Sequence, residues 1–311
     1  MMIHLATSLR RWGPLGLGLL TFALVTTGCD AFIDRDLDDS TTQSPTIAGY
    51  VQEVPALSSL EGAAAEAGLV ETLDTGGPFT VFAPTNDAFS PAIDPSLNRQ
   101  VVGKVVQHHV VSGEVTSDQL SDGQMVTPLA GDDLTIGVGD QVTVNRASVT
   151  NPDASADNGV VHVVDGLLAD AVDRTTLTPR FTIFARLVKE TGLANALREA
   201  GANDGRTIFA PTNEALLGAL DSDGSGEIEA AEIPSNAGDI LQNHVLDSVF
   251  LAADVPESET SVPTLEGSDI TVVRSGDDVT VNPSDEAASV TIPNVEVDNG
   301  VIHGIDAVLL P

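Results

Sequence analysis

Apolar positions recur along the chain with two different spacings. Residues 63–73 and 183–201 carry hydrophobic side chains three and four positions apart, which predicts helices with one buried face. The short runs FTVF (79–82) and TIF (207–209) instead alternate β-branched and aromatic residues, as buried strands do.

Proline and capping residues follow each of these short strands. Pro84 and Pro211 end the strand pattern, because proline cannot continue a hydrogen-bonded strand. The Thr-Asn pairs that follow, with an acidic residue next, are typical of helix N-termini, so a helix is predicted after each strand.

The later part of each half reads as β structure. Residues 134–145 and 270–282 each predict two strands about a Gly/Asp turn, and an Asn-Gly turn precedes a last apolar strand at 159–164 and 300–305. Helices early and strands late indicate an α+β arrangement.

The two halves repeat one another. Three blocks recur in the same order, with 79–89, 105–111 and 157–168 matching 206–216, 240–246 and 298–311. The sequence therefore predicts two related modules, module 1 at 46–170 and module 2 at 176–311, joined by a linker at 171–175.

These blocks resemble the fasciclin domain. The resemblance is carried by GPFTVFAPTNDAF (77–89), by a histidine after an apolar helix, and by DNGVIH (298–303) ahead of the final VLLP, and it covers both modules. It implies two tandem domains, each a β-sandwich-like wedge with helices along one side, that serve in extracellular adhesion or matrix interaction and are not enzymes. The family usually has tyrosine just before the central histidine, where this chain has His108 and Asn243.

The N-terminus predicts export. Residues 1–28 contain two arginines, an apolar run and small residues, with no acidic side chain, as a secretory signal does. LVTTGC resembles a lipobox, which makes Cys29 the predicted lipidation site; ordinary cleavage and an uncleaved anchor are the alternatives. Residues 29–45 then read as a short acidic tether. The expected location is extracytoplasmic, as a membrane-anchored lipoprotein at the cell surface or in the periplasm.

The charge balance limits the classes of partner that the protein can bind. The chain has 46 acidic and 13 basic residues, and its formal net charge is −33 at pH 7. Such a surface excludes binding nucleic acid or anionic lipid through a basic patch, so membrane contact is expected through the N-terminal lipid alone. The expected partner is an unidentified protein or polysaccharide at the cell surface.

The histidines do not indicate a catalytic or metal-binding role. Five of the six lie in apolar runs of the modules, where a buried imidazole usually bonds a backbone group: His108, His109, His162, His244 and His303. The sequence also lacks Gly-x-Ser-x-Gly, phosphate-loop and His-Glu-x-x-His motifs, so an enzyme is not predicted.

One segment of module 2 predicts a metal site. DSDGSGEIEAAE (221–232) fills every constrained position of a twelve-residue calcium loop, including glycine at position 6 and an apolar residue at position 8. The predicted Ca²⁺ ligands are Asp221, Asp223, Ser225, Glu227 through its carbonyl, Glu229 and Glu232. A merely acidic surface loop is the alternative, but acidity does not account for Gly226 or Ile228.

The loop is an insertion that module 1 lacks. From Thr85 to His109 is 24 residues, whereas the equivalent span from Thr212 to His244 is 32. Pro234 shortens any exit helix and no second loop is present to pair with it, so a structural role is predicted and not that of a sensor.

The sequence therefore favours a non-enzymatic, lipid-anchored adhesion or protein-interaction module with one structural calcium. The alternative is a soluble secreted matrix protein that uses calcium to bridge acidic polymers or to self-associate. A hydrolase or small-ligand binder that uses the histidines is a third hypothesis.

Overall fold

A computed structural model describes residues 44–199, 205–282 and 287–311. Residues 43–311 form one compact unit of the chain. The predicted signal peptide, Cys29 and most of the tether lie outside the described residues. Within the described part, no helix combines the length and apolar character needed to cross a membrane.

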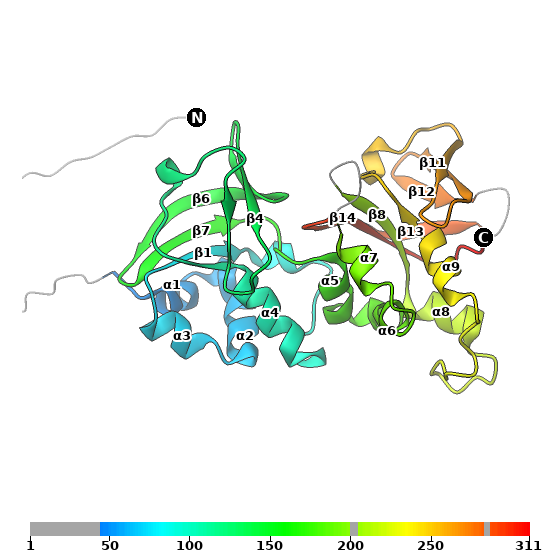
Figure 1. Ribbon diagram of the computed structural model, residues 1–311, viewed down its shortest axis with the longest axis horizontal. Helices are drawn as coiled ribbons and strands as arrows, with labels where there is room; N and C mark the ends of the chain where they lie inside the picture. Colours follow the sequence, from blue (N-terminus) through cyan, green and yellow to red (C-terminus); the bar gives the residue numbers. More distant parts are fainter. Residues whose placement is uncertain (1–43, 200–204, 283–286) are drawn as a thin grey trace, which may run out of the picture. The chain divides into compact units, whose positions relative to one another are not determined.

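In module 1 three helices precede the first strand, a fourth helix follows that strand, and the remaining strands come last (Figure 1). Its helices are α1 (Ile47–Glu53), α2 (Ser58–Ala67), α3 (Val70–Thr75) and α4 (Arg99–His108), with 3₁₀ turns at Pro55–Leu57, Asn86–Phe89, Pro95–Leu97 and Ser117–Gln119. Its strands are β1 (Phe79–Pro84), β2 (Val110–Ser112), β3 (Met125–Val126), β4 (Leu134–Val138), β5 (Val142–Val144), β6 (Ala147–Ala156) and β7 (Gly159–Val164).

Module 2 repeats this plan. The predicted linker residues 171–175 lie within helix α5 (Ala171–Leu177). The further helices are α6 (Thr182–Glu190), α7 (Ala194–Arg198), α8 (Asn213–Leu220) and α9 (Ala237–Asn243), with 3₁₀ turns at Pro179–Phe181 and Ala252–Asp254. Its strands are β8 (Arg206–Pro211), β9 (Val245–Leu246), β10 (Thr260–Pro263), β11 (Asp269–Ser275), β12 (Asp278–Val281), β13 (Ala288–Val297) and β14 (Gly300–Ile305).

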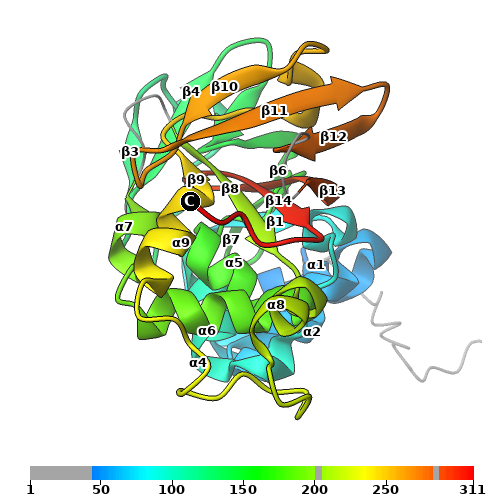
Figure 2. The same cartoon turned by 90° about the vertical axis from the view of Figure 1, so that its right-hand side faces the viewer.

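Both sheets share one topology. The strand orders are β2-β1-β7-β6-β5-β4-β3 and β10-β11-β12-β13-β14-β8-β9, with the first and last long strands of each module paired in parallel. Figure 2 shows the helices of each module gathered on one side of its sheet. The α+β prediction, with a strand-built wedge and helices along one side, is confirmed.

The central parallel pair of each sheet is buried on both faces. In module 1, Val81 and Val161 belong to the core beneath the helices, whereas Phe82 and Val164 belong to a second core with β4 and β5. Because side chains alternate along a strand, one pair of strands supplies both cores. This explains why FTVF has no polar side facing water.

A glycine at the start of each last strand permits the parallel pairing. Gly159 and Gly300 have φ near +146° and +147°, and a Cβ on either would lie 1.9 Å from a backbone oxygen of the neighbouring strand. The Asn-Gly turns of the repeat therefore reflect a close backbone approach as well as turn geometry.

The predicted helix after the first strand forms in module 2 alone. Thr212 caps α8 by accepting a hydrogen bond from the backbone N–H of Ala215, as expected. In module 1 the equivalent segment is a 3₁₀ turn that stops at Phe89. Pro91, which replaces Gly218 of α8, cannot donate to a helix and disfavours helical Ser90, so the prediction was wrong there.

Candidate functional site

The acidic loop 221–232 begins at the C-terminal end of α8. Asp221 caps that helix, since its backbone N–H donates to Leu217. Gly224 and Gly226 then adopt φ values of +75° and +83°, which glycine tolerates without a steric cost. The glycine at position 6 of the predicted loop therefore makes the sharp turn for which such loops use it.

Three of the predicted ligands converge. Carboxylate oxygens of Asp221, Asp223 and Glu232 all lie within 4.8 Å of one another. Oxygen ligands at 2.3–2.6 Å from one Ca²⁺ can be no more than about 5.2 Å apart. The spacing of these three oxygens therefore fits a shared calcium ion.

Backbone N–H groups hold these carboxylates in place. Asp221 accepts hydrogen bonds from Gly224 at 2.8 Å and from Gly226 at 2.9 Å. Glu232 accepts from the backbone of Ser222 at 2.7 Å and of Glu229 at 3.0 Å. The first and last residues of the loop are thus tied across it, which closes it into a ring.

The same hydrogen bonds favour the ionised carboxylates. The backbone N–H of Gly226 is the main cause that lowers the pKa of Asp221, and that of Glu229 is the main cause for Glu232. Both groups therefore stay negatively charged at neutral pH, as ligands of a hard cation must.

The remaining predicted ligands are a hydroxyl, a backbone carbonyl and a further carboxylate. Ser225 donates its hydroxyl to the carbonyl of Glu227 at 2.9 Å, so these two candidate oxygens are adjacent to each other. Glu229 is exposed and contributes its backbone N–H to Glu232. The structure brings together the carboxylates at positions 1, 3 and 12. Ser225 at position 5 lies beside them, since its backbone N–H donates to Asp223 at 2.9 Å and to Asp221 at 3.1 Å.

An apolar anchor fixes the loop to module 2. Ile228 is 2% exposed and belongs to the core beneath the helices, and its carbonyl accepts a 2.7 Å hydrogen bond from Arg186 of α6. No helix follows Glu232 directly; α9 begins only at Ala237, after Pro234. The predicted inward residue and the missing exit helix are both confirmed.

The histidines lie in structural positions. His109 and His244 are fully buried, and each ring bonds a carbonyl of the preceding helix through Nδ1, at 2.7 Å in both modules. Each Nε2 accepts a backbone N–H near the module's C-terminal end, from Leu168 and Leu309 respectively, both at 2.9 Å. Each ring thus joins a helix to the segment after the last strand.

The second histidine pair acts in the same way inside the sheet. His162 and His303 accept a backbone N–H at Nδ1 and contact a carbonyl through Nε2, at 2.9 and 2.8 Å. Each ring also stacks on a core phenylalanine, Phe82 or Phe209. The expectation of buried imidazoles bonded to backbone is confirmed for these four residues.

His108 departs from that expectation. Its Nε2 lies 3.1 Å from Oδ2 of Asp298, and the other carboxylate oxygen, Oδ1, accepts a 2.9 Å hydrogen bond from Asn145. Its partner is therefore a side chain of the other module's Asp-Asn-Gly turn. Spacing along the chain could not show this, because the two residues are 190 positions apart.

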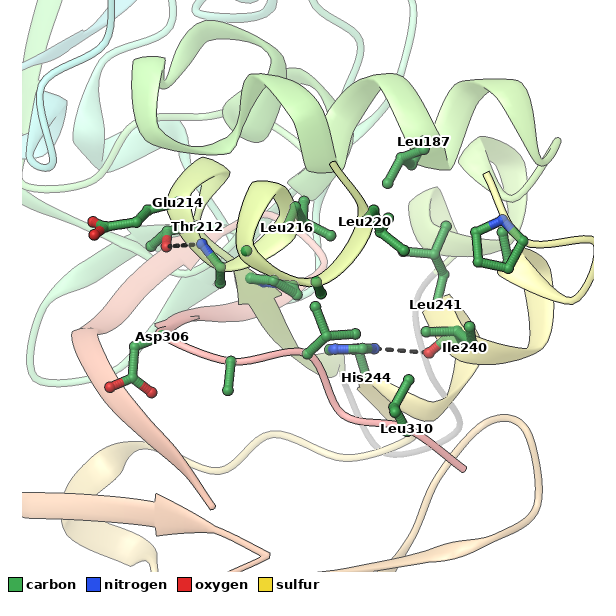
Figure 3. A pocket seen from close by; sticks show the side chains of 18 of the residues that line it. Leu187, Thr212, Glu214, Leu216, Leu220, Ile240, Leu241, His244, Asp306 and Leu310 are labelled. Carbon is green, nitrogen blue, oxygen red and sulfur yellow. Dashed lines mark hydrogen bonds between the residues drawn. The ribbon is translucent and has the colours of Figure 1, made fainter. Parts of the chain in front are cut away.

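Sequence reasoning also missed a cavity in module 2. A pocket of about 590 Å³ lies between α8, α9 and the C-terminal segment, and its lining is mainly apolar. Figure 3 shows Glu214 and Asp306 at one end of it and Leu220, Leu241 and Leu310 toward the other. The sequence signal for this cavity is the set of small residues on one side of α8, Ala215, Gly218 and Ala219.

Comparison with known proteins agrees with the repeat. The fasciclin domain family matches residues 55–170 and 179–311. Protein sll1483 of Synechocystis is 40% identical over 163 residues, which are 49% of this chain and 88% of that protein. The transforming growth factor-beta-induced protein ig-h3 of Sus scrofa is 31% identical over 263 residues, or 76% of this chain and 35% of that protein.

Two further proteins are similar to this chain at lower sequence identity. Human periostin is 28% identical over 266 residues, which are 78% of this chain but 29% of periostin, so this chain spans about a third of these long animal relatives. A solved domain pair from the insect cell adhesion molecule Fasciclin I aligns with 82% of this chain at 19% identity and a TM-score of 0.41, too low to support a detailed comparison. The family match covers nearly all of the described residues, and the chain therefore belongs to the fasciclin domain family.

Proposed function

We propose that this chain is an extracytoplasmic adhesion or protein-interaction module, held to a membrane by a lipid on Cys29 and stiffened by one structural Ca²⁺. Fasciclin domains are adhesion and matrix-interaction modules, which supports the first part of the proposal. The partner is a protein or polysaccharide at the cell surface.

The observation that carries the calcium assignment is the convergence of three carboxylates. Asp221, Asp223 and Glu232 supply hard oxygens at a spacing that one Ca²⁺ can bridge. Ser225, Glu227 through its carbonyl, and Glu229 are the further ligands we propose. A bound ion would neutralise part of this acidic segment and rigidify it. The described residues show no second loop to pair with it, which favours a structural role over a switch.

A calorimetric titration tests this assignment. We expect saturable one-site Ca²⁺ binding to the full chain in high salt, lost in Glu232→Gln. Glu53→Gln is the matched control, because it removes the same charge from an exposed site in module 1. Equal binding by both variants, or none at millimolar Ca²⁺, would show that the loop is an acidic surface segment.

A non-enzymatic role is proposed from the use of the histidines. The rings of His109, His162, His244 and His303 are all buried and engaged with backbone groups, so none presents a free nitrogen to a substrate. The alternative is a soluble secreted matrix protein that bridges acidic polymers, and such a protein would carry no lipid on Cys29. A lipid mass on the N-terminal peptide together with detergent-phase partitioning would exclude it.

A further inference from the structure

The pocket between α8 and α9 has an occupied counterpart in module 1. The repeat aligns Ala215 and Gly218 of α8 with Ala88 and Pro91, and it aligns Ile240 of α9 with Val105. The corresponding surface of module 1 is covered by helix α5, which follows module 1 directly in the chain.

Two side chains of α5 make this contact. Leu177 is fully buried in the same core as Phe89, Val102 and Val105. Arg174 is 1% exposed, and its guanidinium donates hydrogen bonds to backbone carbonyls of the 88–91 segment. Arg174 and Leu177, three positions apart on α5, therefore fill the site in module 1 that corresponds to the pocket of module 2.

The backbone of α5 also joins this surface. The carbonyl of Leu177 accepts a 2.7 Å hydrogen bond from the backbone N–H of Asp94, which caps the 3₁₀ turn Pro95–Leu97 of module 1. Asp94 is the repeat equivalent of Asp221, where α8 ends. The counterpart in module 1 is therefore a helix seated by both side-chain and main-chain contacts.

The side chains of module 2 leave this pocket unfilled. Ala215, Gly218 and Ala219 lie three and four positions apart on α8 and line the pocket, and none is large enough to fill it. Pro234, ahead of α9, and Ala237, the first residue of α9, also line the pocket. The pocket volume of about 590 Å³ lies in the range of ligand-binding sites.

The charges of the two surfaces differ. In module 1, Lys104 on α4 pairs with Asp170 at 3.4 Å and with Asp173 at 3.0 Å, both at the start of α5. The position equivalent to Lys104 in module 2 is Asp239, which is exposed. Opposite charge at this position requires a basic partner residue where α5 has Asp173.

The rim of the pocket adds to this preference. Glu214 and Asp306 stand at one end, and no lysine or arginine is among the described residues that line the pocket (Figure 3). An anionic segment would be repelled there, whereas a basic one would be attracted. The first helix of a second copy fits poorly, since α1 has Tyr50 and Glu53 where α5 has Arg174 and Leu177.

We propose that this pocket docks a short basic amphipathic helix of another protein. The helix carries two consecutive basic residues, the second of which is an arginine, and a leucine three positions after the arginine. The leucine enters the apolar end, and the arginine lies beside the acidic rim formed by Glu214 and Asp306. The proposal rests on the proposed function as an interaction module and names the surface and the chemistry of the partner. It does not depend on calcium.

A tethered helix tests the proposal in the full chain. Pro311 is the repeat equivalent of Asp170, so a copy of residues 171–182 joined after Pro311 begins in register. The copy carries Asp173→Lys to meet Asp239. Tethering raises the local concentration of the helix to the millimolar range, which compensates for its short length.

Hydrogen exchange measures the docking. We expect amide exchange in α8 and α9 to slow about threefold or more with the lysine-bearing extension, and less with the unaltered copy. An extension that also carries Leu177→Asp should give no protection. Equal exchange with the leucine-bearing and aspartate-bearing extensions would overturn the proposal.

Two glycine variants control for the pocket itself. A Cβ on Gly218 of α8 or on Gly238 of α9 would meet no atom within 4 Å, so both positions can carry a side chain, but only Gly218 lines the pocket. Gly218→Leu should abolish the protection and Gly238→Leu should keep it.

Other occupants of the pocket give distinct results with the unextended chain. A dimer, or a co-purified small apolar molecule, that disappears in Gly218→Leu would overturn the helix assignment. Failure of the tethered helix alone would leave surface binding by the chain untouched, so it would not count against the proposed function.

Discussion

The buried histidines make module stability depend on pH in a defined window. Burial lowers the pKa of His109 and of His244 to about 4, from an ordinary value near 6.5. Both rings are neutral in the folded chain, because Nε2 of each accepts a backbone N–H and cannot do so once protonated. We predict that acid destabilises both modules well above the usual carboxylate range.

The sign and size follow from linkage. Below pH 6.5 the unfolded chain binds a proton at each histidine, whereas the folded chain does so only near pH 4. Full stability is therefore present above pH 6.5 and is lost as the pH falls toward 4. Each histidine changes the free energy of unfolding by about 1.4 kcal/mol per pH unit, which is about 3 kcal/mol over the whole window.

Urea denaturation of the full chain between pH 7 and pH 4.5 measures this dependence. High salt reduces the changing repulsion among the many surface carboxylates, since at 1 M the screening length is about 3 Å. His244→Gln removes one titrating group, so its stability should fall less steeply with acid than that of the unaltered chain, by about 1.4 kcal/mol per pH unit.

Nuclear magnetic resonance of the imidazole nitrogens provides a second readout that needs no variant. His109 and His244 should remain neutral at pH 5.5. Rings that titrate near pH 6.5, together with parallel stability curves for His244→Gln and the unaltered chain, would refute the reasoning.

Four further predictions follow from individual contacts. Calcium at a hundred times its dissociation constant should raise the free energy of unfolding by about 2.7 kcal/mol, measured by urea denaturation with and without chelator, and Glu232→Gln should show no difference. Asn299→Ala should cost about 2–3 kcal/mol in the same assay, because the buried amide bonds the backbone of two helices of module 2. Gly300→Ala should prevent stable folding of module 2, seen as loss of its cooperative transition, since the added Cβ would lie 1.9 Å from a backbone oxygen of β8; the exposed Gly218→Ala should fold normally. Cys29→Ser should move the chain from the detergent phase to the aqueous phase, and unchanged partitioning would argue against a lipid at that position.

Much of the fold could be predicted from the sequence. Alternating apolar residues gave the central strands, and the three repeated blocks gave the tandem modules, because both features are local patterns. The helix predicted after Pro84 does not form, because Pro91 prevents a helix in module 1. Module 2 has Gly218 at the equivalent position, and helix α8 continues through it.

The site could be predicted only in part. The acidic loop is contiguous, so its spacing predicts which carboxylates can converge, and Asp221, Asp223 and Glu232 do so. The partner of His108 and the α8–α9 pocket depend on residues far apart in the chain. Periodicity carries no information about such contacts, because they arise only from the packing of the folded chain.

Binding to intact cells tests the central claim of an adhesion or interaction module most directly. Fluorescently labelled chain carrying Cys29→Ser, which removes the proposed lipid, is titrated onto cells of the organism that produces it. We predict saturable binding that excess unlabelled chain displaces and that protease or glycosidase treatment of the cells removes. Binding that increases linearly without saturation, or no binding at all, would contradict the account.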